Sequence, residues 1–147
     1  MLDRAFVGHQ TAPRAIAVEA GQLRAFANAT GETNPVYFDD AAARAAGHPD
    51  LPAPPTFLFC LESLAPEAED VLGLLGVDKG RMLHGEQSFT CGEAIHAGDV
   101  VTLTSRISDI YDKRGGALDF IVRDTEATNQ AGASVGAGRT VIVVRNG

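Results

Sequence analysis

The sequence predicts an α+β domain in which an antiparallel five-stranded sheet wraps around one buried helix. Residues 56–64 (TFLFCLESL) are apolar nearly all round in their first half, which is typical of a helix buried on most sides. The chain after residue 80 alternates between apolar and polar residues in runs separated by turn residues, which is typical of consecutive strands. Because 147 residues lie near the commonest domain size, we expect one domain over residues 1–147.

The residues before the buried helix predict three short elements. Residues 14–19 predict a strand and residues 20–30 a helix, which carries these residues on one face at helical spacing: Leu23, Phe26, Ala27 and Thr30. Gly31 is placed to end that helix. Residues 38–46 predict a second helix, because acidic residues stand in its first turn and Gly47 follows it, as the helix dipole favours.

A proline-rich connection, residues 48–55, leads into the buried helix, and residues 67–75 predict a further helical stretch. Four strands are expected after it, at residues 81–93, 100–110, 118–128 and 135–145. Turn residues lie between them at residues 97–99, 114–116 and 130–132, so neighbouring strands should be antiparallel.

One face of this sheet should be apolar. The residues that alternate with polar neighbours, and therefore predict that face, are Val101, Leu103, Ser105 and Ile107 in one strand and Leu118, Phe120 and Val122 in the next. Residues 141–144 (VIVV) are apolar on both faces and predict an interior strand or one covered by another subunit.

The composition excludes several classes of partner. A net charge of −7 with 12 scattered basic residues argues against nucleic acid, which requires a concentrated cationic surface. The chain start lacks the layout of a signal peptide and no apolar run approaches the ~20 residues of a membrane span, so we expect a soluble, cytoplasmic protein with no membrane partner. Cys60 and Cys91 have no metal-type spacing and are interpreted as buried small apolar residues.

Residues 31–37 (GETNPVY), the site loop, place an acid, an amide and a phenol directly after a helix. Asn34 and Pro35 form a turn-initiating pair that excludes helix at Asn34, so Glu32 and Thr33 should be exposed on a bend. A plain Asx-type turn explains Asn34 as well.

The site loop resembles the signature Gly-Asp-x-Asn-Pro-aliphatic-His of MaoC-like hot-dog hydratases, the (R)-specific enoyl-CoA hydratases and 3-hydroxyacyl dehydratases. Gly31, Asn34 and Pro35 match, whereas Glu32 stands in place of the Asp and Tyr37 in place of the His. The chain is also similar to the N-terminal MaoC-type, FAS1-like dehydratase family over residues 37–47, 53–57, 83–89 and 97–99. The resemblance covers most of the chain and implies the hot-dog fold.

Hydration of an enoyl thioester requires a base that activates water, an acid that protonates the α-carbon and donors for the developing enolate oxygen. In the resembled hydratases an Asp and a His share the water. By position, Glu32 and Tyr37 are therefore the catalytic candidates, and Gly31 and Asn34 would shape the substrate site. The alternatives are a solvated loop acid for Glu32 and a packed aromatic for Tyr37.

The resemblance also implies that backbone N–H groups near the start of the buried helix hold the thioester oxygen. Pro55, Thr56 and Phe57 are the corresponding substrate-binding candidates, although a simple N-cap explains Thr56 equally well. His84 is the candidate to replace the missing imidazole, with an exposed or structural histidine as its alternative. His84-x-Glu86 lacks the downstream cysteines of a zinc deaminase, so no metal is predicted.

These features predict a protein that binds an acyl thioester, with coenzyme A or an acyl-carrier protein as the handle and no other cofactor. The resemblance suggests a catalytically incomplete subunit that pairs with a catalytic MaoC-like subunit. Three alternatives are a homodimeric hydratase that uses Glu32, a hot-dog thioesterase that uses Glu62, and a non-enzymatic binding module. A homodimer or heterodimer is expected in each case, because a five-stranded sheet around one helix leaves an edge to cover.

Overall fold

The computed structural model describes residues 2–66 and 69–147. Its strands are β1 (Arg14–Ala17), β2 (Met82–Cys91), β3 (Val100–Lys113), β4 (Leu118–Thr128) and β5 (Ser134–Arg145). Its α-helices are α1 (Ala20–Ala29), α2 (Asp40–Ala45), α3 (Phe57–Leu64) and α4 (Val71–Leu74). Three short 3-10 turns, η1 (Arg4–Phe6), η2 (Pro35–Tyr37) and η3 (Lys79–Arg81), complete the order.

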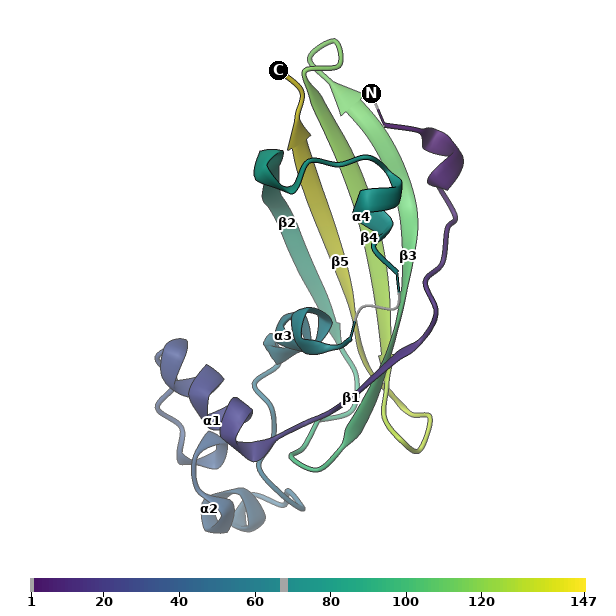
Figure 1. Ribbon diagram of the computed structural model, residues 1–147. Coiled ribbons are helices and arrows are strands. Elements are labelled where there is room, and N and C mark those ends of the chain that lie inside the picture. The colour runs from purple at the N-terminus through teal and green to yellow at the C-terminus, as the bar shows by residue number, and fades with distance from the viewer. Residues whose placement is uncertain (1, 67–68) are drawn as a thin grey trace.

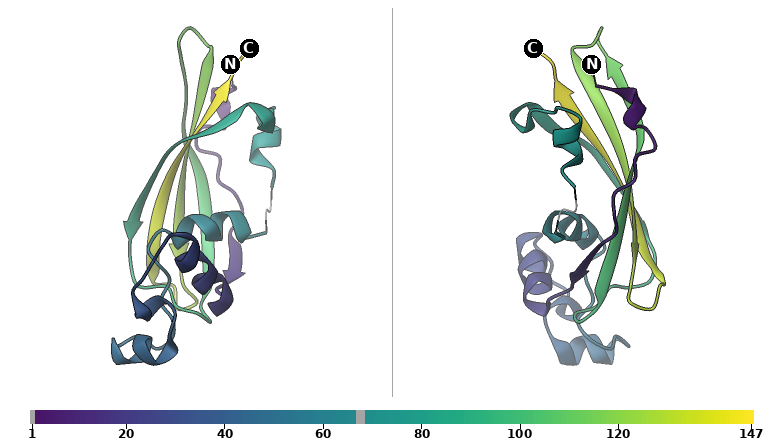
Figure 2. Two further views of the ribbon diagram at one scale, coloured as in Figure 1. Left: turned by 90° about the vertical axis from the view of Figure 1, so that its left-hand side faces the viewer. Right: turned by 45° about the vertical axis from the view of Figure 1, so that its right-hand side comes forward.

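The five strands form one antiparallel sheet in the order β1-β3-β4-β5-β2 (Figure 1). The helices lie on one side of it: α3 crosses one half of the sheet with α1 and α2 beyond it, and α4 faces the other half (Figure 2). The predicted α+β architecture of a sheet around one helix is therefore confirmed. The apolar segment in residues 141–144 is also placed as predicted, because β5 is an interior strand between β4 and β2.

The core divides into two clusters along the sheet. The larger one surrounds α3, where Phe57, Leu58 and Leu61 are almost fully buried. The second lies between α4 and the far half of the sheet and contains Leu75, Val77, Ile107, Ile110, Ile121, Ile142 and Val144. The apolar spacing of the helices thus specifies one cluster, and the alternation of the strands specifies both.

The apolar face of β4 was predicted incorrectly. Ile121 pairs with Ile110 and is buried, whereas Phe120 and Val122 lie on the opposite face, as the alternation of a strand requires. β4 carries apolar residues on both faces, so its own alternation does not fix its phase. Pairing with β3 fixes it, through a register shift between Ile107 and Asp109.

Three smaller expectations also differ. The helix predicted over residues 67–75 is only the four-residue α4, and residues 67 and 68 lie outside the described residues. Cys91 is exposed and Cys60 is half-buried, so the prediction that both are buried is wrong. The turn η2, which ends the site loop, had no periodic apolar pattern and was not predicted.

Candidate functional site

The site loop begins where α1 ends. Gly31 N–H donates to Asn28 O at 3.1 Å and Glu32 N–H donates to Ala27 O at 2.9 Å, the paired hydrogen bonds of a Schellman motif. Gly31 has φ of 73°, a left-handed conformation that glycine adopts without the steric cost of a side chain. The predicted role of Gly31 in ending the helix is confirmed.

The carboxylate of Glu32 is turned back onto its own loop. Its Oε1 accepts hydrogen bonds from Thr33 N–H at 2.8 Å and from Asn34 N–H at 3.0 Å. These backbone donors, Asn34 first and Thr33 second, hold the pKa of Glu32 below its ordinary value, because they favour the charged form. Glu32 is therefore a structural acceptor in this chain, and its carboxylate is a weakened base.

Asn34 and Tyr37 bound the turn that follows. The side-chain Oδ1 of Asn34 accepts from Val36 N–H at 3.1 Å, so the Asx-type turn is present. Tyr37 is half-buried, and within residues 2–66 and 69–147 its hydroxyl has no hydrogen-bond partner. The position that holds the motif histidine in the resembled hydratases therefore carries a phenol and no imidazole.

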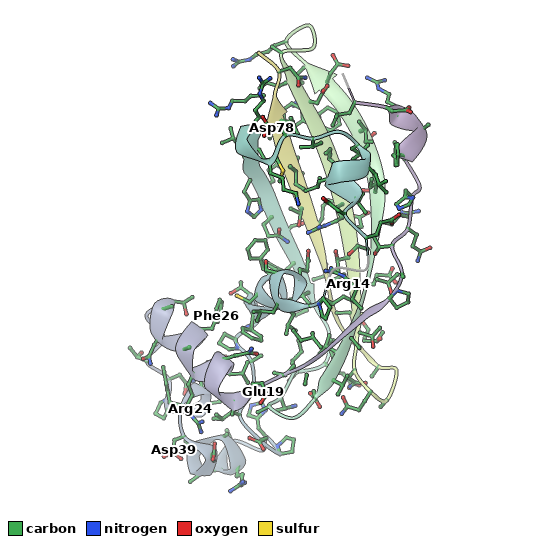
Figure 3. All side chains as sticks on the ribbon, in the orientation of Figure 1. Arg14, Glu19, Arg24, Phe26, Asp39 and Asp78 are labelled. Atoms are coloured by element: carbon green, nitrogen blue, oxygen red, sulfur yellow. The ribbon has the colours of Figure 1, made fainter. Side chains whose placement is uncertain are left out.

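The loop is fixed to α1 by an arginine. Arg24 Nε donates to Phe38 O at 3.0 Å and Arg24 Nη2 to Asp40 Oδ1 at 2.9 Å. Asp39, which is labelled with Arg24 in Figure 3, accepts from the first N–H groups of α2 and so caps that helix. Arg24 and Asp39 thus fix the end of the site loop to α1 and to the start of α2.

The start of α3 lies beside the helix that carries the loop. Phe57 is buried and its ring packs edge-on against Phe26 of α1, with 5.4 Å between centroids (Figure 3). Pro55 and Thr56 are exposed there. Thr56 occupies the N-cap position of α3, as the alternative interpretation expects, but its side chain makes no capping hydrogen bond.

His84 lies on β2 next to α3 and not in the site loop. Its exposed ring stacks on Phe59 with 5.2 Å between centroids and 19° between planes. No hydrogen bond or ring contact in the described part of the chain joins Glu32 or Tyr37 to Thr56 or His84. The predicted site residues therefore form two groups, one at the end of α1 and one along α3.

A histidine pair was missed. His48 Nδ1 and His96 Nε2 lie 3.0 Å apart, between the loop after α2 and the loop before β3. Burial is the main cause that lowers the pKa of His96, while the nearby carboxylate of Asp99 opposes it. The two residues are 48 positions apart, and neither has a local motif that could have joined them.

A buried ion pair was also missed. Glu62, in the last turn of α3, has only 2% of its side chain exposed, and its Oε2 accepts from Arg123 Nη2 at 2.8 Å. Glu62 therefore does not face water, although its place near the helix end favours a solvent-exposed side chain over the base of a thioesterase. A signal was available, because Glu62 follows Leu58 by four residues and so shares its buried face.

The described residues contain neither a candidate membrane-spanning helix nor a candidate metal-binding cluster. None of the described helices has the length and apolar character that a membrane crossing requires. A search of the same residues finds no group of three His, Cys, Asp or Glu side chains placed to hold a metal ion.

Comparisons with known proteins agree on one family. Residues 5–137 match the model of the FAS1-like, dehydratase domain region. A UPF0336 protein of Streptomyces coelicolor is 38% identical over 145 residues, which cover 98% of this chain and 95% of that relative.

Among solved structures, the HadBC (3R-hydroxyacyl-ACP dehydratase) complex of Mycobacterium tuberculosis aligns with a TM-score of 0.77 and 27% identity, covering 94% of this chain and 96% of that one. A MaoC-like dehydratase aligns with a TM-score of 0.81 and 26% identity, covering 97% of this chain and 43% of that one. These neighbours have the hot-dog fold that the sequence predicts.

Proposed function

Because this chain belongs to the FAS1-like dehydratase region family of MaoC-like hot-dog proteins, we propose that it binds an acyl thioester and leaves the proton transfers to a second subunit. The reaction class is hydration of an enoyl thioester or its reverse, dehydration of a 3-hydroxyacyl thioester. In this proposal the chain is the substrate-binding half of a heterodimer.

The observation that carries the proposal is the hydrogen bonding of Glu32. A general base must present a free lone pair to the water that it activates, and its pKa should lie near the working pH. Oε1 of Glu32 accepts two backbone N–H groups, which leaves only Oε2 to face a water, and these N–H groups lower the pKa of Glu32, so its carboxylate is a weaker base. With Tyr37 in the position of the histidine, the loop offers no imidazole to share the water.

Two features along α3 support substrate binding by this chain. Pro55 and Thr56 are exposed at its start, and unbonded N–H groups at a helix start favour a partly negative oxygen such as that of a polarised thioester. Phe57 N–H is not one of these, because it donates to Pro54 O at 2.9 Å. The stacked pair His84 and Phe59 supplies a flat aromatic surface further along α3. This chain would bind and orient the thioester, while the acid and the histidine of a partner would move the protons.

The exposed edge of the sheet supports the proposal of a heterodimer. β2 is an edge strand, so the N–H and C=O groups on its outer side are available for pairing with another sheet. The similar HadBC structure is a complex named as a 3R-hydroxyacyl-ACP dehydratase, which supports both a dissimilar partner and a carrier-protein handle. Coenzyme A remains the second possible handle.

A thioesterase reaction has weaker support. It would use Glu62 as base or nucleophile, but that side chain is 2% exposed and is held by Arg123. A carboxylate paired with a guanidinium is stabilised in its charged form and is a poorer nucleophile for it.

The test is to purify this chain together with a MaoC-like protein from the same genome that carries the complete Gly-Asp-x-Asn-Pro-x-His motif. We expect a stable complex that hydrates crotonyl-CoA or its carrier-protein thioester. Glu32→Gln should lower kcat of the complex by less than about threefold, because Glu32 transfers no proton. Replacing the motif acid of the partner should abolish turnover. A loss of turnover with Glu32→Gln in a folded complex would contradict the proposal.

A further inference from the structure

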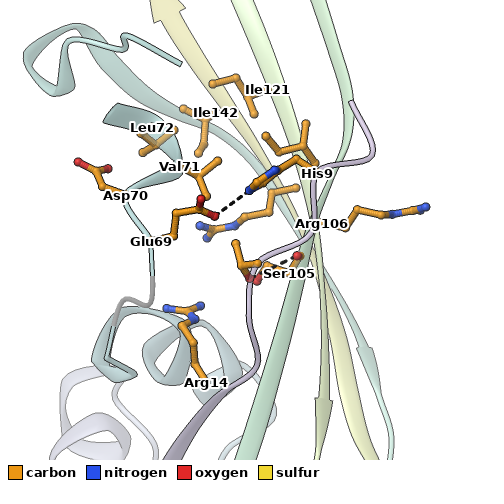
Figure 4. A pocket seen from close by; sticks show the side chains of 13 residues that line it. His9, Arg14, Glu69, Asp70, Val71, Leu72, Ser105, Arg106, Ile121 and Ile142 are labelled. Atoms are coloured by element: carbon orange, nitrogen blue, oxygen red, sulfur yellow. Dashed lines mark hydrogen bonds and ion pairs between the residues drawn. The ribbon is translucent and has the colours of Figure 1, made fainter. Parts of the chain in front are cut away.

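A pocket opens between α4 and the far half of the sheet, beyond the C-terminal end of α3 (Figure 4). Its cavity volume of about 60 Å³ is enough for a small chemical group and too little for a whole ligand. We name it the α4 pocket. Its residues come from the segment before β1 and the first residue of β1, from α4 and its preceding residues, and from β3, β4 and β5.

Most of the wall of the α4 pocket is apolar. Ile107, Ile121 and Ile142 project from three neighbouring strands, and Val71 and Leu72 face them from α4. All five belong to the second core cluster or pack against it. Such a wall suits a hydrocarbon segment.

The α4 pocket also contains a cation with unused donors. Arg14 Nη1 donates to Glu62 O at 3.2 Å, at the end of α3. Within the described ranges Arg14 makes no further hydrogen bond and no ion pair. Figure 4 shows its side chain rising from β1 towards Glu69, so the remaining guanidinium N–H groups are directed to the interior of the pocket.

The acids around Arg14 are engaged elsewhere. Glu69 Oε2 lies 2.7 Å from His9 Nε2, and Asp70 caps α4 and lies 3.3 Å from Lys79 Nζ. Glu62 is held through its Oε2 by Arg123 Nη2, while Glu62 Oε1 and Arg123 Nε are both buried with no hydrogen-bond partner in the described residues. An oxygen acceptor that entered the pocket would therefore meet donors that no described acid satisfies.

From these contacts we propose that the α4 pocket receives the far end of the acyl chain and selects a chain that ends in a carboxylate. The inference rests on the proposed binding of an acyl thioester and names its substrate class. α3 has eight residues and is about 12 Å long, so a thioester at its start would place a medium-length chain with its end near Arg14. A guanidinium matches a carboxylate in charge and in planar geometry, which makes it a selective reader of that group.

The experiment compares thioesters of equal length that differ only at the far end. The purified chain is titrated calorimetrically with adipyl-, suberyl- and sebacyl-CoA, each a monothioester with a free carboxylate. The same chain is titrated with hexanoyl-, octanoyl- and decanoyl-CoA for comparison. We expect the carboxylate form to bind about tenfold more tightly at one of these lengths, as a charge-assisted hydrogen bond allows. Equal or weaker binding of the carboxylate form at every length would overturn the inference and leave the proposed function intact. No binding of any thioester would remove the proposed function itself.

Variants locate the effect. Arg14→Met should reduce the preference for the carboxylate to less than about twofold, whereas Arg14→Lys should retain part of it. Arg106→Met is the matched control, because Arg106 belongs to the same pocket lining but its side chain points away from the cavity (Figure 4). Since Arg14 also bonds the end of α3, Val71→Trp provides a second variant that fills the pocket and should remove the preference with Arg14 intact. An unchanged preference in either Arg14→Met or Val71→Trp would place the carboxylate elsewhere and contradict the inference.

Discussion

The site loop and the end of α3 each contain a glutamate carboxylate, but the first lies near the surface and the second is buried. In the loop, Glu32 lies near the surface, and Oε1 of its carboxylate accepts two N–H groups from the backbone of its own turn. At the end of α3, Glu62 is buried, its Oε2 is bound by Arg123, and its Oε1 has no hydrogen-bond partner in the described residues. The first arrangement stabilises a backbone shape, and the second holds charge inside the protein at a cost in desolvation.

The contrast indicates that a match to a sequence signature is a poorer guide to a binding site than the polar atoms that lack a hydrogen-bond partner. The loop resembles a catalytic signature in its glycine, amide and proline, yet one oxygen of its acid is hydrogen-bonded within the loop. The guanidinium groups beside Glu62 match no signature, yet Arg14 and Arg123 carry N–H groups that no described residue accepts. In the second region a ligand would gain hydrogen bonds from these guanidinium N–H groups.

The largest expected effect comes from breaking the buried ion pair. Glu62→Gln should lower the free energy of unfolding by about 2–3 kcal/mol, because Arg123 keeps its charge without a partner. This estimate is below the usual cost of a fully buried pair, because Arg123 is 32% exposed. Denaturant unfolding measures the change. Asp124→Asn, which breaks the more exposed pair with Arg139, is the control and should cost at most about 1 kcal/mol.

A second substitution tests whether the site loop is mainly a shaped backbone. Gly31→Ala should lower the free energy of unfolding by about 1–2 kcal/mol, since φ of 73° is unfavourable for any residue with a Cβ. Gly21→Ala is a matched control inside α1, where an added Cβ would meet no atom within 4 Å. That variant should be neutral or more stable, because alanine favours a helix. Equal losses in the two variants would contradict the Schellman ending described above.

A smaller effect is expected at the anchor of the loop. Arg24→Met removes the hydrogen bonds to Phe38 O and Asp40 but keeps the aliphatic stem, so the loss of stability should be about 0.5–1 kcal/mol. Thioester affinity should fall more than stability does if the loop shape contributes to binding. Calorimetric titration of crotonyl-CoA against the variant separates the two effects, and unchanged affinity would show that the loop does not contact the ligand.

The smallest effect concerns pH. Burial lowers the pKa of His96 below its ordinary value of about 6.5, so the fold favours the neutral ring. The contribution of the neutral His96 ring to the free energy of unfolding is therefore complete above about pH 6.5. It is lost as the pH falls through the lower pKa that His96 has in the folded protein. We expect Tm to fall on acidification in this range and to fall less steeply in His96→Gln. The control His84→Gln removes an exposed ring and should leave the slope unchanged.

Much of the fold followed from the sequence for identifiable reasons. The buried helix was signalled by its apolar surface and the strands by alternation and by turn residues, and both signals are local. The phase of β4 could not be read, because Phe120 and Ile121 both lie in apolar sets and only the pairing of Ile121 with Ile110 decides between them. A tertiary contact settled what a local pattern left open.

The candidate site followed less completely. The sequence located the loop and the start of α3, but the direction of a carboxylate depends on backbone geometry that residue identity does not encode. Thus the position of Glu32 in the sequence predicts a catalytic residue, whereas its hydrogen bonds to Thr33 and Asn34 appear only in the structure. Glu62 and Arg123, which form an ion pair, are 61 residues apart in the sequence. The residues of the α4 pocket come from several separate segments and form no linear motif.

The most direct test of the central claim measures binding and turnover on the same sample of the purified chain. Calorimetry with crotonyl-CoA reports binding, and the loss of the enoyl-thioester absorbance reports hydration. The account predicts binding without turnover, because Glu32 is engaged by its own loop and Tyr37 replaces the histidine. Turnover by the chain alone that disappears in Glu32→Gln would contradict it and would identify Glu32 as a working base.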